Sequence, residues 1–113
     1  MVKDRKYVPD RGDLVWLNFT PQAGHEQQGL RPAIVISPLE YNDRVGLGLF
    51  CPITKHKKGY PFEVDVKNSK IKGVILSDHL KSLDWRIRKV EFIAKADNKI
   101  LASVCENLKL LIF

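Results

Sequence analysis

A series of short apolar segments, separated by turn-forming residues at intervals of roughly 8–12 residues, constrains the fold of this sequence more than any other feature. From it we predict six strands, in residues 13–19, 31–37, 46–54, 60–67, 73–83 and 87–94. Residues 60–67 alternate apolar with charged side chains, which is typical of a half-buried strand. The pattern indicates a small barrel or a sandwich, and we expect a strongly twisted, partly open barrel.

The end of the chain changes period. Apolar residues recur at three- and four-residue spacing from Ile100 to Ile112, and Asp97 stands where a helix N-cap belongs. This segment predicts one amphipathic helix that closes the chain, and residues 38–44 can hold one helical turn. Pro52 indicates an edge strand or a bulge. Trp85 is expected in an exposed connection between the last two strands.

The length of 113 residues predicts a single domain, residues 1–113, whose core needs neither disulfides nor a metal. Nineteen Lys and Arg residues outnumber 13 Asp and Glu residues, which gives a net charge of +6. Such a surface favours an acidic partner, whether nucleic acid, an acidic protein tail or an anionic membrane. The alternative is a charge that only maintains solubility.

The two cysteines, Cys51 and Cys105, lie in apolar surroundings without a Cys-x-x-Cys motif. We interpret them as small core residues of a reducing compartment rather than as zinc ligands or a disulfide. The amino terminus has no apolar leader segment, and no run approaches the ~18 apolar residues that cross a bilayer. We therefore expect a cytoplasmic protein without contact to membranes.

The connection between the first two predicted strands is the strongest candidate for a functional site. Residues 24–32 place His25, Glu26 and Arg31 in one long polar loop that also holds two glycines and two glutamines. Connections of this length are commonly functional, and these side chains suit phosphate binding or acid–base chemistry. A merely solvated polar loop is the alternative.

Several motifs along the chain resemble, in the expected order, the MazF/PemK (Kid) family of toxins from bacterial type II toxin–antitoxin modules. They are Gly12-Asp13-Leu14-Val15-Trp16, His25-Glu26-Gln27-Gln28-Gly29 with Arg31-Pro32, Pro52-Ile53-Thr54, Lys58-Gly59-Tyr60-Pro61-Phe62-Glu63-Val64, and Gly73-Val74 with Asp78 and Lys81-Ser82. The block from Lys58 to Val64 and the pair Trp85-Arg86 resemble the MazF branch most, whereas residues 23–29 resemble the PemK branch.

The resemblance implies an SH3-like small barrel, mainly β with a C-terminal helix, that forms a homodimer. It implies a sequence-specific endoribonuclease that cuts single-stranded messenger RNA without a metal or another cofactor, leaving a 2′,3′-cyclic phosphate and a 5′-hydroxyl. It further implies a cognate MazE/PemI-like antitoxin, whose acidic tail covers the RNA groove. Operator DNA is then bound only through the toxin–antitoxin complex.

Four residues are candidates for catalysis. Arg31 offers a permanently charged fork of donors to a phosphorane, and the resemblance assigns a catalytic threonine to Thr54. Glu26 is a candidate base if burial raises its pKa, and His25 competes for that role with a reference pKa of ~6.5. Asp78 aligns with an acid of the PemK branch, but the arginine that accompanies it there is replaced by Leu76.

The remaining candidates bind RNA. Lys55, Lys57 and Lys58 form a basic turn that can neutralise phosphates, and aromatic side chains can stack unpaired bases. The predicted RNA-binding residues are Lys55, Lys57, Lys58, Tyr60, Phe62, Asp78, His79 and Trp85. Two other readings stay open: a CcdB-like gyrase inhibitor on the same small barrel, and an RNA-binding barrel without catalysis.

Overall fold

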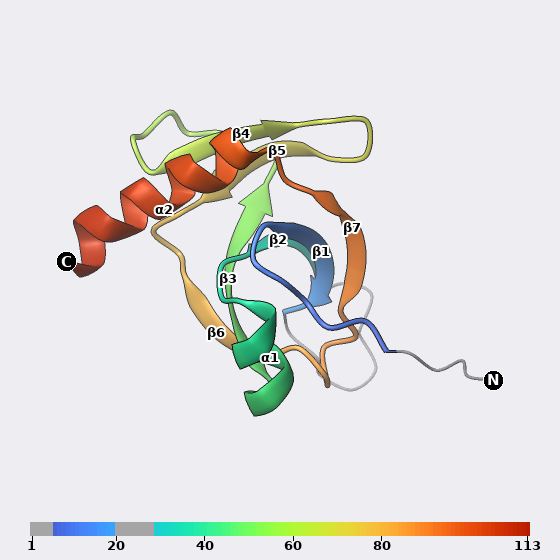
Figure 1. Cartoon of the computed structure of the whole chain (residues 1–113). Helices are drawn as coiled ribbons and strands as arrows, with labels where there is room; N and C mark the ends of the chain where they lie inside the picture. The colour runs from blue at the N-terminus through green and yellow to red at the C-terminus, as the bar shows by residue number, and fades with distance from the viewer. Residues whose placement is uncertain (1–5, 20–28) are drawn as a thin grey trace.

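The computed structural model describes residues 6–19 and 29–113. In these residues seven strands and two helices follow one another along the chain (Figure 1). The strands are β1 (Asp13–Asn18), β2 (Leu30–Val35), β3 (Leu47–Thr54), β4 (Glu63–Lys67), β5 (Lys72–Leu76), β6 (Lys81–Asp84) and β7 (Glu91–Lys95). The helices are α1 (Leu39–Val45) and α2 (Asn98–Ile112). Neither is both long and apolar enough to cross a bilayer.

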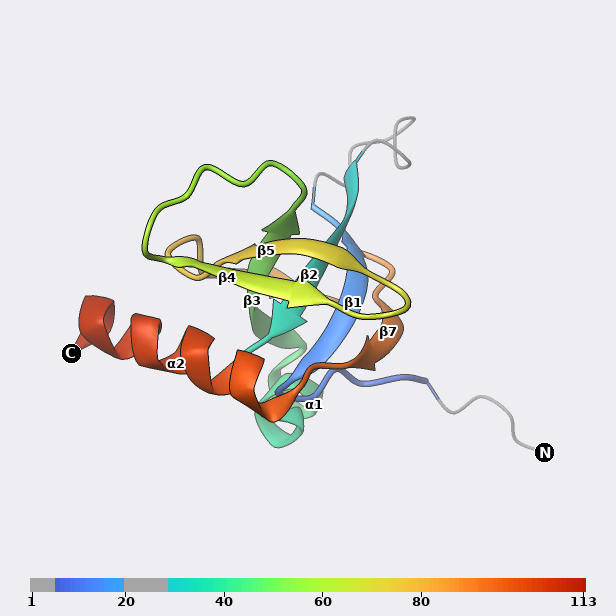
Figure 2. The same ribbon diagram turned by 90° about the horizontal axis from the view of Figure 1, so that it is seen from above.

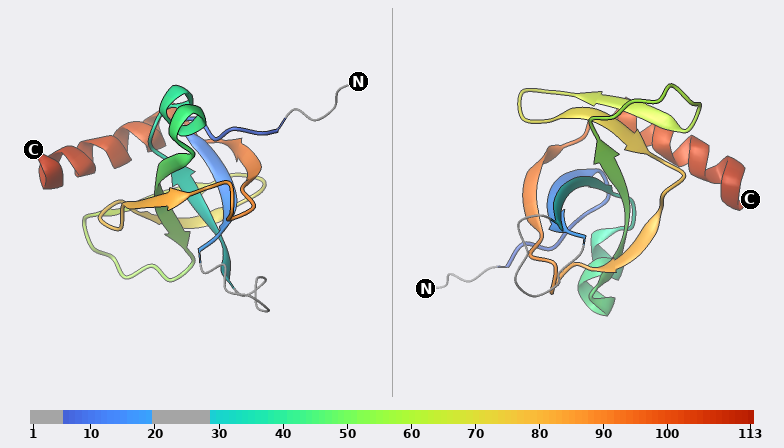
Figure 3. Two further views of the ribbon diagram at one scale, coloured as in Figure 1. Left: turned by 90° about the horizontal axis from the view of Figure 1, so that it is seen from below. Right: turned by 180° about the vertical axis from the view of Figure 1, so that it is seen from behind.

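All described strand pairs are antiparallel, and their order in the sheet is β4-β5-β3-β2-β1-β7, with β6 attached to β3. The sheet curves into a partly open barrel, which is seen from behind in Figure 3. The β4–β5 hairpin and α2 lie at one end of the barrel and α1 lies at the other (Figures 1 and 2). The predicted fold class, mainly β with a C-terminal helix in a small barrel, is confirmed.

Strand β3 is the centre of the sheet because it changes partners along its length. Its residues from Leu47 to Phe50 pair with β6, whereas Ile53 and Thr54 pair with β5. Pro52 lies between these two stretches, opposite Ala33 of β2. Of the two alternatives predicted for Pro52, the edge strand is wrong, because β3 lies between β2 and β5, and the register with β2 shows no bulge at this residue. A strand that switches partners can accommodate a residue without a backbone N–H at the switch.

Two apolar clusters hold the barrel together. One joins the sheet to α2 and includes Ile75, Val104 and Cys51, whose thiol is fully buried. The other is centred on Phe50 and includes Trp85. Helix α2 begins as the periodicity predicts, because the Asp97 carboxylate accepts a hydrogen bond from the backbone N–H of Lys99 at 3.0 Å.

Two expectations about local structure differ from the fold. Residues 73–83 do not form one extended segment, because a turn with the hydrogen bond His79 N–H to Leu76 O (3.0 Å) separates β5 from β6. The single helical turn expected near residue 40 is a seven-residue helix, α1, which ends at Gly46 with a φ of 84°. That left-handed conformation favours glycine and stops the helix.

The expectation that Trp85 is exposed is wrong. Its side chain is 5% exposed, and its indole N–H donates to the carbonyl of Asn42 at 3.1 Å. The Arg86 guanidinium lies 5.1 Å from the centre of the indole ring. Because β6 ends at Asp84 and the chain then turns, the indole packs toward α1 and is not available to stack on a base.

Candidate functional site

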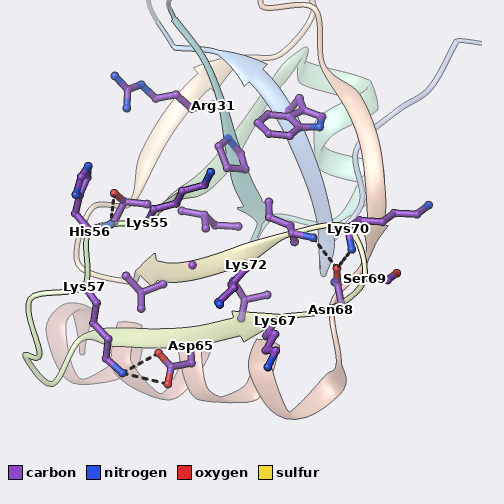
Figure 4. Close-up of a pocket in the computed structure, with 18 of the residues that line it drawn as sticks. Arg31, Lys55, His56, Lys57, Asp65, Lys67, Asn68, Ser69, Lys70 and Lys72 are labelled. Carbon is purple, nitrogen blue, oxygen red and sulfur yellow. Dashed lines mark hydrogen bonds and ion pairs between the residues drawn. The ribbon is translucent and has the colours of Figure 1, made fainter.

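A groove of about 1120 Å³ runs between the start of β2, the end of β3 and the β4–β5 hairpin (Figure 4). Arg31, Lys55 and His56 lie on one side of it, and the far end of the hairpin, with Lys67 and Lys70, lies on the other. The sheet order explains this meeting of distant segments. Strand β3 pairs with both β2 and β5, so residues 31, 54 and 74 come together at one rim.

Arg31 is the second residue of β2 and pairs with Leu17 of β1. Its side chain is exposed and lines the groove. Among the described residues, no carboxylate lies within ion-pair distance of its guanidinium. A guanidinium without a carboxylate partner keeps its donors free for a phosphate.

Thr54 is the last residue of β3 and also lines the groove. Its hydroxyl oxygen accepts a hydrogen bond from the backbone N–H of His56 at 3.1 Å, which fixes the start of the basic turn. The neighbouring strand approaches very closely here, since a Cβ added at Gly73 would lie 2.5 Å from the carbonyl oxygen of Thr54. Glycine at position 73 therefore permits the packing that positions Thr54.

The basic turn is shaped by Glu63 at the start of β4. Its carboxylate accepts hydrogen bonds from the backbone N–H groups of Lys58 and Gly59, each at 2.8 Å. These bonds, led by that of Lys58, hold the pKa of Glu63 below its ordinary value. Lys57 also pairs with Asp65 at 3.2 Å. The turn thus presents its exposed lysines from a backbone that β4 holds in place.

Tyr60, Asp78 and His79 form a second group, outside the groove. The Tyr60 hydroxyl donates to the Asp78 carboxylate at 2.8 Å, and this bond is the main reason why the pKa of Tyr60 is raised. The His79 ring nitrogen Nε2 lies 3.9 Å from the same carboxylate oxygen. Phe62 is half-buried nearby, and its carbonyl accepts a bond from Ser77 N–H at 3.0 Å.

The structure therefore divides the predicted site residues. Four of them line the groove together: Arg31, Thr54, Lys55 and Lys57. Lys58, Tyr60, Phe62, Asp78 and His79 lie beside the groove without lining it. Trp85 is buried away from solvent. His25 and Glu26 lie outside the described residues.

Several groove residues were not recognised in the sequence. Trp16 is half-buried, lines the groove and pairs with Pro32 across β1 and β2. Its neighbours Val15 and Leu17 are fully buried, so the alternation of a strand would have placed Trp16 on the opposite face. Lys67 ends a predicted strand, and Lys70 and Lys72 lie between two predicted strands; none of the three was a candidate for the site, and all three line the groove.

Among the described residues, no three His, Cys, Asp or Glu side chains gather as metal ligands. The positive charge of the groove is instead carried by Arg31 and the lysines. This charge, an exposed guanidinium, a strand-end hydroxyl and an aromatic ring form an arrangement that can bind and polarise a phosphodiester.

The family model for PemK-like, MazF-like toxins of type II toxin–antitoxin systems matches residues 10–112. The chain therefore belongs to this family of toxins. It is 51% identical over 83 residues to the protein named endoribonuclease toxin MazF of Escherichia coli K12, covering 74% of this chain and 75% of that protein. The E. coli protein named endoribonuclease PemK is 27% identical over 109 residues, covering 92% of this chain and 82% of that protein. The expected closer relation to the MazF branch is confirmed.

Solved structures agree with these relatives. A crystal structure of MazF (Form-I) from Deinococcus radiodurans has a TM-score of 0.85 and 55% identity, covering 95% of this chain and 98% of that chain. A crystal structure of MazE-MazF (Form-II) from the same organism has a TM-score of 0.85 and 48% identity, covering 95% of this chain and 97% of that chain.

Proposed function

We propose that this chain is the endoribonuclease toxin of a type II toxin–antitoxin module and cuts single-stranded RNA, chiefly mRNA, in the groove that holds Arg31 and Thr54. Family membership and the relatives named as endoribonucleases support the activity. One observation carries the assignment to this groove. Arg31 and Thr54 line the same lysine-rich groove, and the Arg31 guanidinium forms no ion pair with a carboxylate of the described residues.

The proposed reaction is an attack of the ribose 2′-hydroxyl on the adjacent phosphorus. The 2′-oxygen forms a bond to phosphorus while the bond to the 5′-oxygen breaks, which leaves a 2′,3′-cyclic phosphate and, after proton transfer, a 5′-hydroxyl. Arg31 stabilises the negative charge that grows on the phosphorane, because stabilising developing charge is usually the largest catalytic term. Thr54, held at the end of β3, orients the phosphate.

The 2′-hydroxyl proton needs a base, and we propose Glu26 or His25, which precede β2 in the sequence and lie outside the described residues. Asp78 is less suited, since it already accepts a hydrogen bond from Tyr60 and does not line the groove. A histidine with an ordinary pKa of ~6.5 or a glutamate with a raised pKa can accept a proton near neutral pH. The lysines of the basic turn hold phosphates.

The substrate and partners follow from the same surface. Trp16 lies half-buried in the groove, where it can stack an unpaired base, and single strands expose such bases. We propose an antitoxin whose acidic tail occupies the basic groove, as MazE-MazF complexes are among the similar structures. We further propose a homodimer that acts in the cytoplasm and meets operator DNA only through the antitoxin.

The direct test is Arg31→Ala, assayed on a long single-stranded RNA in EDTA. We expect cleavage to fall ~10²–10³-fold or more, as when a group that stabilises transition-state charge is removed. Arg31→Lys should restore only part of the rate, because an ammonium lacks the planar fork. Arg44→Ala, which removes an exposed arginine of α1, is the matched control and should cut at the wild-type rate.

The chemistry of the RNA product ends distinguishes the proposed endoribonuclease from an RNA-binding barrel without catalysis. New 5′-hydroxyl and 2′,3′-cyclic phosphate ends support the proposal, whereas saturable RNA binding without new ends would indicate a non-catalytic barrel. A CcdB-like gyrase inhibitor is not favoured, since the relatives named above are endoribonucleases. Wild-type cleavage by the Arg31→Ala variant would remove Arg31 from the mechanism.

A further inference from the structure

Three lysines lie close together in sequence at one end of the β4–β5 hairpin: Lys67 at the end of β4, Lys70 in the turn and Lys72 at the start of β5. We call them the lysine ridge. All three are exposed and line the groove, Lys67 and Lys70 at the end away from the basic turn and Lys72 nearer the middle (Figure 4). The catalytic proposal does not use them. They extend the positive charge of the groove beyond Arg31 and Thr54.

The charges of the ridge are not neutralised by neighbours. Lys67 and Lys72 pair directly across the hairpin, and like charges opposite one another destabilise a strand pair. Asp65 is the one carboxylate among the described groove-lining residues, and it pairs with Lys57 at 3.2 Å. No described carboxylate forms an ion pair with Lys67, Lys70 or Lys72. An arrangement that costs folding energy therefore indicates a ligand that supplies the missing negative charge.

The ridge has a fixed position relative to the proposed cleavage site. Val74 of β5 pairs with Thr54. Lys72 precedes Val74 by two residues, so the backbone positions of these two residues are ~7 Å apart at the rise of an extended strand. The Asn68 side chain accepts hydrogen bonds from the backbone N–H groups of Lys70 (2.7 Å) and Ile71 (2.9 Å), which rigidify the turn. The Lys70 ammonium donates to the carbonyl of Ile93 at 3.4 Å and ties the turn to β7.

We propose that the lysine ridge binds phosphates of the RNA strand that flank the scissile phosphate, so that the strand leaves the cleavage site along the β4–β5 hairpin. This inference rests on the proposed endoribonuclease function and adds a second part to its binding surface. Several exposed lysines at neighbouring positions can neutralise phosphates of a nucleic-acid backbone without recognising particular bases. The ridge then contributes to substrate affinity, and Arg31 to the chemical step.

The test compares two RNA substrates that share one mapped cleavage site. The short RNA carries only the nucleotides around that site, and the long RNA extends by about ten nucleotides on both sides. The test protein is Lys67→Gln/Lys72→Gln, and the matched control is Arg44→Gln/Lys109→Gln, which removes two positive charges from the helices outside the groove.

We expect the ridge variant to lose about tenfold in kcat/KM on the long RNA, mainly through KM, and clearly less on the short RNA. Each lost phosphate contact should reduce the slope of log affinity against log salt by ~0.7, so the pair should reduce it by ~1.4. Because the variant removes a like-charge pair, its midpoint of thermal unfolding should not fall. The control should resemble the wild type on both substrates.

The outcomes keep the two proposals apart. If the wild type cuts neither RNA, the proposed function fails. If the wild type cuts both RNAs, the proposed function stands. If the ridge variant then loses the same factor in kcat/KM on both RNAs, or loses none, the proposed path of the flanking RNA along the hairpin is wrong. If the control variant shows the same loss of kcat/KM on the long RNA, the loss is explained by the lower net charge alone. That result would also contradict phosphate binding by the lysine ridge.

Discussion

Asp13 shows how a single buried charge can be stabilised in this fold. It is 2% exposed, and its carboxylate accepts hydrogen bonds from the Tyr7 hydroxyl and from the backbone N–H of Asp10. The Lys95 ammonium lies 2.5 Å from its other oxygen. A buried carboxylate needs such partners, because an unpaired one would be too costly to desolvate. The three side chains therefore connect the N-terminal arm, β1 and β7.

We predict that Tyr7→Phe lowers the free energy of unfolding by ~1.5–3 kcal/mol near pH 8, since it removes a hydrogen bond to a charged group. Burial, and then the bond to Asp13, raise the pKa of Tyr7 well above its ordinary value of 10.0. Below that ordinary value both folded and unfolded chains keep the phenolic proton, so the contribution is complete. As the pH rises above it, the unfolded chain loses its proton first and the contribution shrinks.

Urea unfolding of wild type and Tyr7→Phe between pH 8 and pH 11 measures this directly. The difference in the free energy of unfolding between the two proteins should be constant up to about pH 10 and should then decrease. Lys95, whose pKa is raised mainly by its bond to Asp13, loses its contribution in the same alkaline direction in both proteins. A difference that stays constant to pH 11 would show that the Tyr7 proton is not coupled to folding.

The two tryptophans show why residue-level function is difficult to predict from sequence. Trp85 follows a predicted strand in a charged stretch, which favours exposure, yet it is buried beside Phe50. Trp16 stands within an apolar run, which favours the core, yet it lines the groove. Which face of a strand meets a groove depends on how distant strands pair, and that information is not local.

At the scale of elements, the contact between β3 and β5 determines where Thr54 lies. Gly73 is opposite Val66 of β4, and a Cβ there would meet both the Thr54 carbonyl oxygen at 2.5 Å and the Ile53 side chain at 3.1 Å. The first of these is backbone and cannot rotate away. Any side chain at position 73 must therefore move β5 relative to the end of β3.

We predict that Gly73→Ala lowers stability by ~1–3 kcal/mol, as overpacking commonly does, and lowers kcat by a larger factor than that stability loss explains. The comparison is Val64→Ala, a half-buried residue of β4 that packs against the core cluster and pairs with Ile75 of β5. Cleavage rates are measured well below both unfolding transitions. Equal kcat values for the two variants would contradict a role of Gly73 in positioning Thr54.

The elements themselves were largely predictable. Alternation identified the strand around residues 63–67, and the three-to-four spacing with Asp97 identified α2, because both signals are local. The break between β5 and β6 was missed, since the sequence around the turn at Ser77 offers no glycine or proline. The central position of β3 was not predicted, because a proline within a strand indicates an edge or a bulge.

At the scale of the whole molecule, the first and last strands lie side by side. Strand β1 is held between β2 and β7, with Asp13 opposite Lys95. The Ala96 backbone N–H donates to the Gly12 carbonyl at 2.8 Å. Residues from β7 and α2, including Ile93, Val104 and Leu108, complete the core cluster. The N-terminal half of the barrel therefore depends on the last part of the chain.

We predict that a chain ending at residue 90 does not fold cooperatively. It lacks β7, one of the two partners of β1, and the three buried side chains named above. Each large apolar residue lost from a core costs ~2–5 kcal/mol, against a total stability of ~5–15 kcal/mol. Circular dichroism and urea titration of this fragment, beside the full chain, provide the measurement. A sigmoidal urea transition in the fragment would contradict the prediction.

The candidate site was predictable only in part, and the reason lies at this scale. Arg31, Thr54 and the basic turn were recognised through the family resemblance, which follows motifs along the chain. The lysine ridge and Trp16 were not, because they join the groove only when β1, β3 and the β4–β5 hairpin curve around it. His25 and Glu26 remain predictions, since they lie outside the described residues.

The pairing of β1 with β7 also has a consequence for how the toxin is made. A ribosome translates from the amino end, so Arg31 and Thr54 leave it long before the strand that completes the sheet around β1 has been translated. The nascent chain should accordingly be harmless to the message from which it is being read. Ribonuclease activity is therefore expected only after β7 has been translated and has paired with β1.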